Sequence, residues 1–282
     1  MTKIVDKRRV IQKLLVSQPI NIPVFHDIAL RLQQMMNDHT YRIEEVIKLV
    51  HEDTALATEM LKHANSTYNS GKTPITTIKN AIVRLGSQQI VNLAFTASMA
   101  NTTSDNVIIN KHLKQLWHHC HTVAITSSWL AVEVNHTSNR IYDINADEVY
   151  LAGLLHDIGK LYLLKAMDNL LTIGVLQADD YFINDIIEEL GVPSGVKVMN
   201  YWHLPPIYSD SIGRHTTDTW KCGVNDHLVA AIRLACKIHD YIERGVEITN
   251  GGNDLTGIND ELSLLGIDDV TYVYGIEKAL VD

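Results

Sequence analysis

Apolar residues recur every three or four positions along most of the 282-residue chain, which places them on one face of an α-helix. Clear examples are residues 22–36, 78–100, 111–134 and 225–245. Strict alternation of apolar and polar residues, which is typical of half-buried strands, is scarce. Its best example is a short Tyr-Val-Tyr-Gly run near the end of the chain. The pattern therefore predicts an all-α protein.

Local signals predict where several of these helices begin and end. Asp53 interrupts the periodic stretch 42–65 and is a good N-cap residue, so a new helix is expected after it. Asn65 and Ser66 follow an apolar run and are expected to cap the end of that helix. Within residues 184–215, the runs Gly-Val-Pro-Ser-Gly and Leu-Pro-Pro predict breaks that leave two or three short helices.

The clearest change in composition is the polar, turn-forming run Asn-Thr-Thr-Ser-Asp-Asn at 101–106. A boundary there divides the chain into an N-terminal helical part (1–104), a helical core (105–248) and a C-terminal helical tail (249–282). These parts account for the whole chain, so we expect a stand-alone module without an attached sensory domain.

Charge and cysteine content narrow the choice of partners and compartment. The chain has 33 acidic and 24 basic residues and a formal net charge of −9, which argues against nonspecific binding to nucleic acid or to an anionic membrane. No apolar run has the length of a membrane span. Cys120, Cys222 and Cys236 are widely spaced and odd in number, which is typical of reduced thiols. We therefore expect a cytoplasmic protein.

An adjacent His156 and Asp157 interrupt the apolar run 151–164. A carboxylate in such a run is strongly destabilising unless it is paired or bound to a metal. The leucine spacing predicts one continuous helix through both residues that ends or bends at Gly159. On that helix the imidazole and the carboxylate would point into one cavity and bind a divalent ion. Lys160 follows closely enough to contact a phosphate oxygen.

Other histidines differ in their suitability as metal ligands. His119 lies on the apolar stripe of its helix, so its side chain is predicted to face inward. His118 and His121 diverge from it, because consecutive helical residues are about 100° apart. A second histidine–aspartate pair, His239 and Asp240, lacks the apolar approach and the following glycine. We interpret these two as surface residues.

Several separate motifs resemble one protein family. The run Leu-Leu-His-Asp-Ile-Gly-Lys, preceded by a helix with Trp-His-His-Cys-His-Thr-Val-Ala, resembles the HD superfamily of metal-dependent phosphohydrolases. His-Ala-Asn-Ser at 63–66, Val-Arg-Leu-Gly at 83–86 and Asn-Tyr-Trp-His-Leu-Pro at 200–205 are similar to the HDOD domain, the HD-related output domain of bacterial signalling proteins. The resemblance covers residues 18–245. It implies a multi-helix bundle of the HD-domain type with an N-terminal helical subdomain, a bacterial source and a role downstream of signalling.

The resemblance also implies a set of metal ligands. In the HD superfamily the metal is held by a first histidine, the HD pair and an aspartate on a later helix, and some branches add further histidines. These positions correspond to His119, His156 and Asp157, and His215 matches one of the additional histidines. Where catalytic members have Ala-Asp, this chain has Ala235–Cys236. The metal site is therefore predicted to be degenerate.

Two functions are compatible with this ligand set. The first is a noncatalytic or weakly catalytic signalling module that binds a signalling protein or a small anionic ligand, and the missing aspartate favours it. The second is a metal-dependent phosphohydrolase acting on a nucleotide or phosphoester. In the second, the four ligands hold an Fe, Mn, Zn or Mg ion, Asp157 is essential for catalysis and Lys160 neutralises developing charge. A protein without any metal is an equal alternative. A third, weaker possibility is that the N-terminal helices 20–100 form the working surface and the HD half is a scaffold.

Overall fold

The protein was analysed as a computed structural model, in which every regular element of the described residues is a helix and none is long and apolar enough to cross a membrane. This confirms the predicted all-α fold. The described residues are 27–37, 41–66, 74–137, 144–174, 176–177, 179–218, 223, 225–246 and 257–281.

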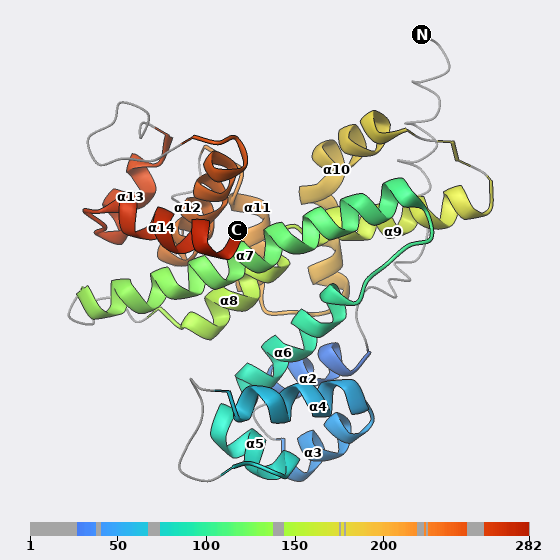
Figure 1. The fold of residues 1–282 in the computed structure, drawn as a ribbon, viewed down its shortest axis with the longest axis vertical. Coiled ribbons are helices and arrows are strands. Elements are labelled where there is room, and N and C mark those ends of the chain that lie inside the picture. Colours follow the sequence, from blue (N-terminus) through green and yellow to red (C-terminus); the bar gives the residue numbers. More distant parts are fainter. Residues whose placement is uncertain are drawn as a thin grey trace. The chain divides into compact units, whose positions relative to one another are not determined.

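The chain divides into two compact units, which we call the N-terminal unit (residues 23–102 and 202–205) and the HD unit (chiefly residues 103–201 and 206–282). The three-part division derived from composition stays a prediction. The N-terminal unit contains α2 (Asp27–Asn37), α3 (Ile43–His51), α4 (Thr54–Ala64), α5 (Ile78–Leu85) and α6 (Ser87–Ala100) (Figure 1).

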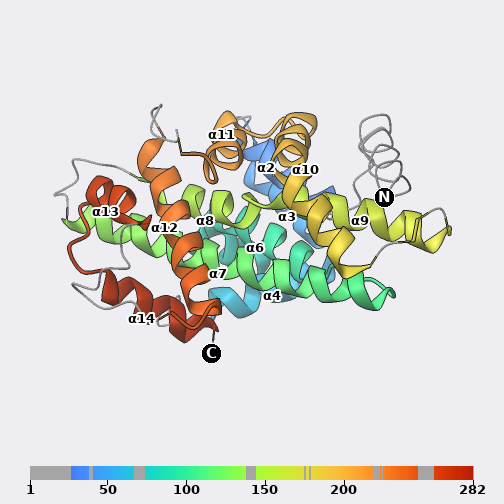
Figure 2. The ribbon, with the colours of Figure 1, turned by 90° about the horizontal axis from the view of Figure 1, so that it is seen from above.

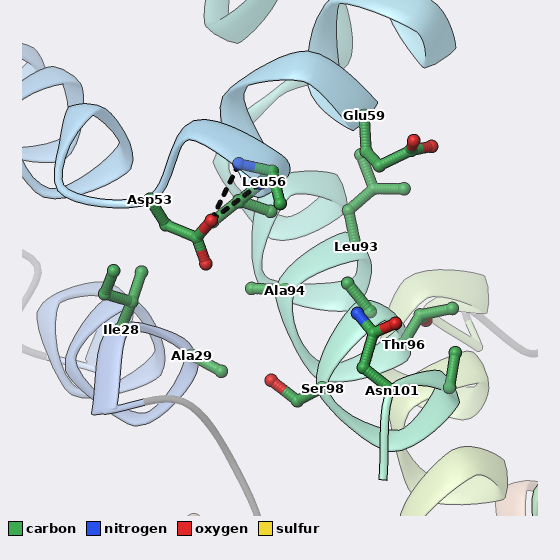
Figure 3. Close-up of a pocket in the computed structure, with 13 residues that line it drawn as sticks. Ile28, Ala29, Asp53, Leu56, Glu59, Leu93, Ala94, Thr96, Ser98 and Asn101 are labelled. Carbon is green, nitrogen blue, oxygen red and sulfur yellow. Dashed lines mark hydrogen bonds between the residues drawn. The ribbon is translucent and has the colours of Figure 1, made fainter. Parts of the chain in front are cut away.

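Both predicted caps of α4 are confirmed. The Asp53 carboxylate accepts hydrogen bonds from the backbone N–H groups of Ala55 and Leu56, at 2.9 and 3.0 Å (Figure 3). At the other end, the Asn65 side-chain amide donates to the carbonyls of Leu61 and Ile75, at 2.8 Å each. The Asp53 bonds satisfy backbone N–H groups that the start of α4 leaves without helical partners, and the Asn65 bonds link the end of α4 to Ile75.

The HD unit is built around the 31-residue helix α7 (Val107–Thr137). Helices α8 and α9 lie alongside α7, and α12 crosses it (Figures 1 and 2). Helix α14 packs on α7 and α12, and it contains the Tyr-Val-Tyr-Gly run. The remaining bounds in this unit are α8 (Ala146–Leu155), α9 (Ile158–Thr172), α10 (Asp180–Tyr201), α11 (Pro206–Arg214), α12 (Asp226–Glu243), α13 (Asn259–Leu265) and α14 (Val270–Val281).

The predicted break at Gly-Val-Pro-Ser-Gly is wrong, because α10 continues through Pro193 as a single helix. The glycines of this run serve packing instead. A Cβ atom added to Gly159 of α9 would lie 1.9 Å from the carbonyl oxygen of Gly191 and 2.4 Å from the backbone nitrogen of Gly195. Backbone contact between α9 and α10 thus stabilises a segment whose local helix propensity is weak. The break predicted at Leu-Pro-Pro is confirmed, since α10 ends at Tyr201.

The continuous helix predicted through the HD pair is also wrong. Helix α8 ends at Leu155 and α9 begins at Ile158, so His156 and Asp157 form the turn between two helices. The leucine periodicity could not reveal this break, because both helices bury apolar residues on either side of it. Gly159 lies in the first turn of α9, where its contact with α10 requires a glycine.

We expect Gly159→Ala to lower the free energy of unfolding by roughly 3 kcal/mol, because the added methyl group would overlap the α10 backbone. Urea unfolding followed by circular dichroism measures the change. Gly213→Ala in α11 is the matched control, since a Cβ there meets nothing within 4 Å, and it should leave stability unchanged or raise it by up to about 1 kcal/mol. Equal stability of both variants would contradict the assigned α9–α10 contact.

Candidate metal centre

The HD unit brings all four sequence-predicted metal ligands into one cluster. His119 comes from the middle of α7, His156 and Asp157 from the α8–α9 turn, and His215 follows the end of α11. The side chains of His156, Asp157 and His215 are at most 6% exposed, and that of His119 is 25% exposed. Residues far apart in the sequence therefore share one largely buried site.

The ring nitrogens of the cluster converge on the Asp157 carboxylate. Its Oδ2 atom is 3.8 Å from His119 Nε2 and 3.6 Å from His156 Nε2, and its Oδ1 atom is 3.7 Å from His215 Nε2. The two Nε2 atoms of His119 and His156 are 3.1 Å apart. The carboxylate distances exceed normal hydrogen-bond lengths, so these atoms surround a small space rather than bond directly to the carboxylate.

Backbone contacts fix the orientation of two of the imidazoles. The Nδ1 atom of His156 lies 2.6 Å from the Gly153 carbonyl oxygen, and that of His215 lies 2.9 Å from the Ile212 carbonyl oxygen. A carbonyl only accepts, so each Nδ1 carries the proton and each neutral ring directs an Nε2 lone pair toward Asp157. Lone pairs that face a carboxylate favour a cation between them, as at metal-binding histidines.

Lys160 supplies the protein's own cation to this carboxylate. Its Nζ atom lies 3.0 Å from Asp157 Oδ2 and 3.0 Å from Glu188 Oε1. Burial would raise the pKa of Asp157, but His156 and Lys160 lower it below its ordinary value. Burial would lower the pKa of Lys160, but Asp157 and Glu188 raise it. Both groups are therefore charged, and their pairing offsets the cost of a buried carboxylate.

Cys236 of α12 lies beside His119 and His156. Its Sγ atom is 3.6 Å from His156 Nε2, and the donor atoms of His119, His156 and Cys236 all lie within 4.8 Å of one another. Burial and the charge of Asp157 raise the pKa of this thiol well above its ordinary value. Cys120 of α7 is buried, and Cys222 lies outside the described residues.

The interpretation of His239 as a surface residue is wrong. His239 is 1% exposed, and its ring centroid lies 4.8 Å from that of His119. Its Nδ1 atom is 3.4 Å from Oε1 of Glu277, a fully buried residue of α14. The sequence does indicate that His239 is buried, because His239 follows the core residue Ala235 by one helical turn. Asp240 is exposed, as predicted.

A cavity of about 470 Å³ opens onto the cluster. Five carboxylates and two ammonium groups line it, so the lining is net negative when its histidines are neutral. An anionic ligand would meet unfavourable potential there. The carboxylates are Asp157, Asp180, Glu188, Asp240 and Glu243, and the ammonium groups are Lys111 and Lys160.

The N-terminal unit has a cavity of its own, of about 440 Å³, between α2, the start of α4 and α6 (Figure 3). Small and apolar side chains such as Ala29, Leu56 and Ala94 make up most of its lining, with Ser98 and Asn101 at one end. It is lined by no histidine or cysteine among the residues that the structure describes. Its lining therefore offers neither imidazole nor thiolate to a metal.

The buried imidazoles predict acid-sensitive stability. Burial, together with His156, lowers the pKa of His215 from 6.5 to about 4. Between these values the unfolded chain binds a proton that the folded chain does not, so the free energy of unfolding falls as the pH is lowered from 6.5 to about 4. For one group the slope is at most about 1.4 kcal/mol per pH unit.

We expect His215→Asn, which keeps a donor for the Ile212 carbonyl, to remove this contribution. Urea unfolding of chelator-treated protein across that pH range measures it. The variant should show a shallower dependence by about one proton. Identical slopes for the variant and the parent would contradict the buried neutral state of His215.

Comparison with known proteins identifies relatives of both the sequence and the fold. A protein from Shewanella amazonensis SB2B, provisionally named a metal-dependent phosphohydrolase, has 19% identity and a TM-score of 0.72, with both chains fully covered. An HDOD domain protein of unknown function from Geobacter sulfurreducens has 22% identity and a TM-score of 0.61, over 98% of this chain and 93% of that one. Identities this low establish a shared fold and no more.

A provisionally named signal transduction protein from Marinobacter aquaeolei VT8 has 18% identity and a TM-score of 0.60, over 93% of this chain and 57% of that chain. An uncharacterized protein of Treponema pallidum (strain Nichols) is 22% identical over 201 residues, which are 69% of this chain and 37% of that relative. The chain thus spans well under half of this relative's length. The family model for the HDOD domain matches residues 22–217. The chain therefore belongs to the HDOD domain family.

Proposed function

We propose that this HDOD protein is a signalling module that acts by binding a partner protein and does not hydrolyse phosphoesters. One observation carries the proposal. Within the described residues, the groups of metal-donor atoms that lie close together contain three imidazoles, one thiol and a single carboxylate, that of Asp157. Two-metal hydrolysis relies on two ions held about 4 Å apart, and hard ions such as Mg²⁺ and Mn²⁺ prefer oxygen ligands. One carboxylate is too few to hold such a pair.

The charges around the site support the same proposal. Lys160 was predicted to neutralise charge on a phosphate, but its ammonium group is already shared between Asp157 and Glu188. The net negative lining of the cavity adds a further barrier to an anionic substrate. Partner binding is consistent with membership of the HDOD family.

The donor set does fit a single ion. His119, His156 and Asp157, with Cys236 or His215 completing the set, would hold it. A bound ion would supply a fixed positive charge that holds α7, α12 and the α8–α9 turn together. The buried polar cluster then stabilises the packing of these helices, and thereby the surface that the partner recognises.

Hydrolysis remains the second candidate because the cavity opens directly onto Asp157 and His119. A phosphoester that reached this point would contact the predicted ligands. An assay of phosphoester hydrolysis therefore decides whether the site is catalytic.

We expect the wild-type protein to release no more p-nitrophenol from p-nitrophenyl phosphate or bis(p-nitrophenyl) phosphate than Asp157→Asn does. The assay is run with Mg²⁺, Mn²⁺, Fe²⁺ or Zn²⁺ added singly. Asp157→Asn keeps the shape of the side chain and removes its charge, and circular dichroism verifies that the variant is folded. Metal-dependent turnover by the wild type that this variant lacks would overturn the proposal and establish a phosphohydrolase.

A further inference from the structure

We propose that Cys236 makes the cluster around His156 and Asp157 a mononuclear zinc site. In this site His119 Nε2, His156 Nε2 and Cys236 Sγ bind one ion, and Asp157 completes the coordination. The inference deepens the proposed function and rests on it in one respect, namely that the site holds one ion rather than a hydrolytic pair. It differs from a hydrolytic pair of ions, because a thiol stands where the resemblance to the HD superfamily implies a carboxylate.

Two separations between the donor atoms match zinc coordination. With zinc–nitrogen bonds near 2.05 Å and a zinc–sulfur bond near 2.3 Å, tetrahedral ligands lie roughly 3.4 Å apart for two nitrogens and roughly 3.6 Å apart for nitrogen and sulfur. The corresponding distances are 3.1 Å between His119 Nε2 and His156 Nε2 and 3.6 Å between His156 Nε2 and Cys236 Sγ. Asp157 is grouped with His156 and His215 and not with Cys236, so its side chain has to shift to complete the coordination.

The orientation of His156 is an independent observation that points to a cation. Its side chain is 1% exposed, and its Nδ1–H group is held by the Gly153 carbonyl at 2.6 Å. The Nε2 lone pair is therefore aimed into the space between Cys236 and Asp157, at 3.6 Å from both the sulfur atom and Oδ2. A backbone carbonyl that fixes the other ring nitrogen is the usual outer support of a zinc-bound histidine.

Charge balance favours one zinc ion over two. Binding of Zn²⁺ displaces the proton of the Cys236 thiol to solvent, and the resulting thiolate and the carboxylate of Asp157 neutralise the ion, so the buried centre carries no net charge. The thiolate selects zinc over magnesium or manganese, because it is a soft ligand. Lys160 keeps its second partner, Glu188, at 3.0 Å when Asp157 coordinates the ion.

The test uses the full chain, treated with chelator and then titrated with Co²⁺, whose absorption reports both sulfur ligation and geometry. We expect a sulfur-to-cobalt charge-transfer band in the near ultraviolet together with intense visible bands of tetrahedral cobalt. Zn²⁺ should abolish these bands at one equivalent. Cys236→Ser should lack the charge-transfer band and bind Zn²⁺ at least about tenfold more weakly.

Cys120→Ala is the matched control, because Cys120 is the other cysteine in the described part of the HD unit and is buried one residue away from His119. This variant should keep the charge-transfer band. Cys236→Asp is a second variant, in case the serine variant does not fold. It should shift the preference from Zn²⁺ toward Mn²⁺ in a competition titration.

Absence of the charge-transfer band in the wild type, or its persistence in Cys236→Ser, would overturn the zinc assignment. This result is distinguishable from failure of the proposed function. A protein that hydrolyses phosphoesters but shows the band would refute the noncatalytic role and leave the cysteine ligand in place. A protein with neither turnover nor the band would refute the zinc site alone.

Discussion

The burial of the Asp157 carboxylate at the turn between α8 and α9 is the constraint on which the HD unit depends. An ionised carboxylate that is 4% exposed requires compensating charge and oriented polar groups. Lys160 supplies the charge from the first turn of α9, and imidazoles face the carboxylate from α7 and from the end of α11. Close packing of α9 on α10 through Gly159 then holds this turn in place. The helices of this unit are arranged around one polar cluster.

Much of the fold could be predicted from the sequence, because helical periodicity and helix caps are local properties. The caps of α4 formed by Asp53 and by Asn65 are examples. The break at the HD pair could not be predicted, since apolar residues continue on both sides of it. The continuity of α10 was missed for the opposite reason. Glycine and proline signal a break locally, whereas here the glycines permit a contact with α9 that depends on tertiary structure.

The site was predictable in its ligand types but not in its full composition. His119, His156, Asp157 and His215 do come together, whereas buried His239 and its neighbour Glu277 were missed. Glu277 lies on α14, beyond the part of the chain that the family model matches. A shared fold at 18–22% identity transfers architecture and not chemistry. In the proposed zinc site the chemistry depends on Cys236, which stands where the resemblance to the HD superfamily implies an aspartate.

We expect the cluster of His119, His156, Asp157 and Cys236 to hold one thiolate-bound ion and not a hydrolytic pair. Elemental analysis of untagged protein, purified without chelator and at a known concentration, tests it most directly. The expected result is about one equivalent of zinc per chain, with little iron or manganese. Two equivalents of iron or manganese would contradict it, and so would a protein that contains no metal and takes up none when titrated with zinc.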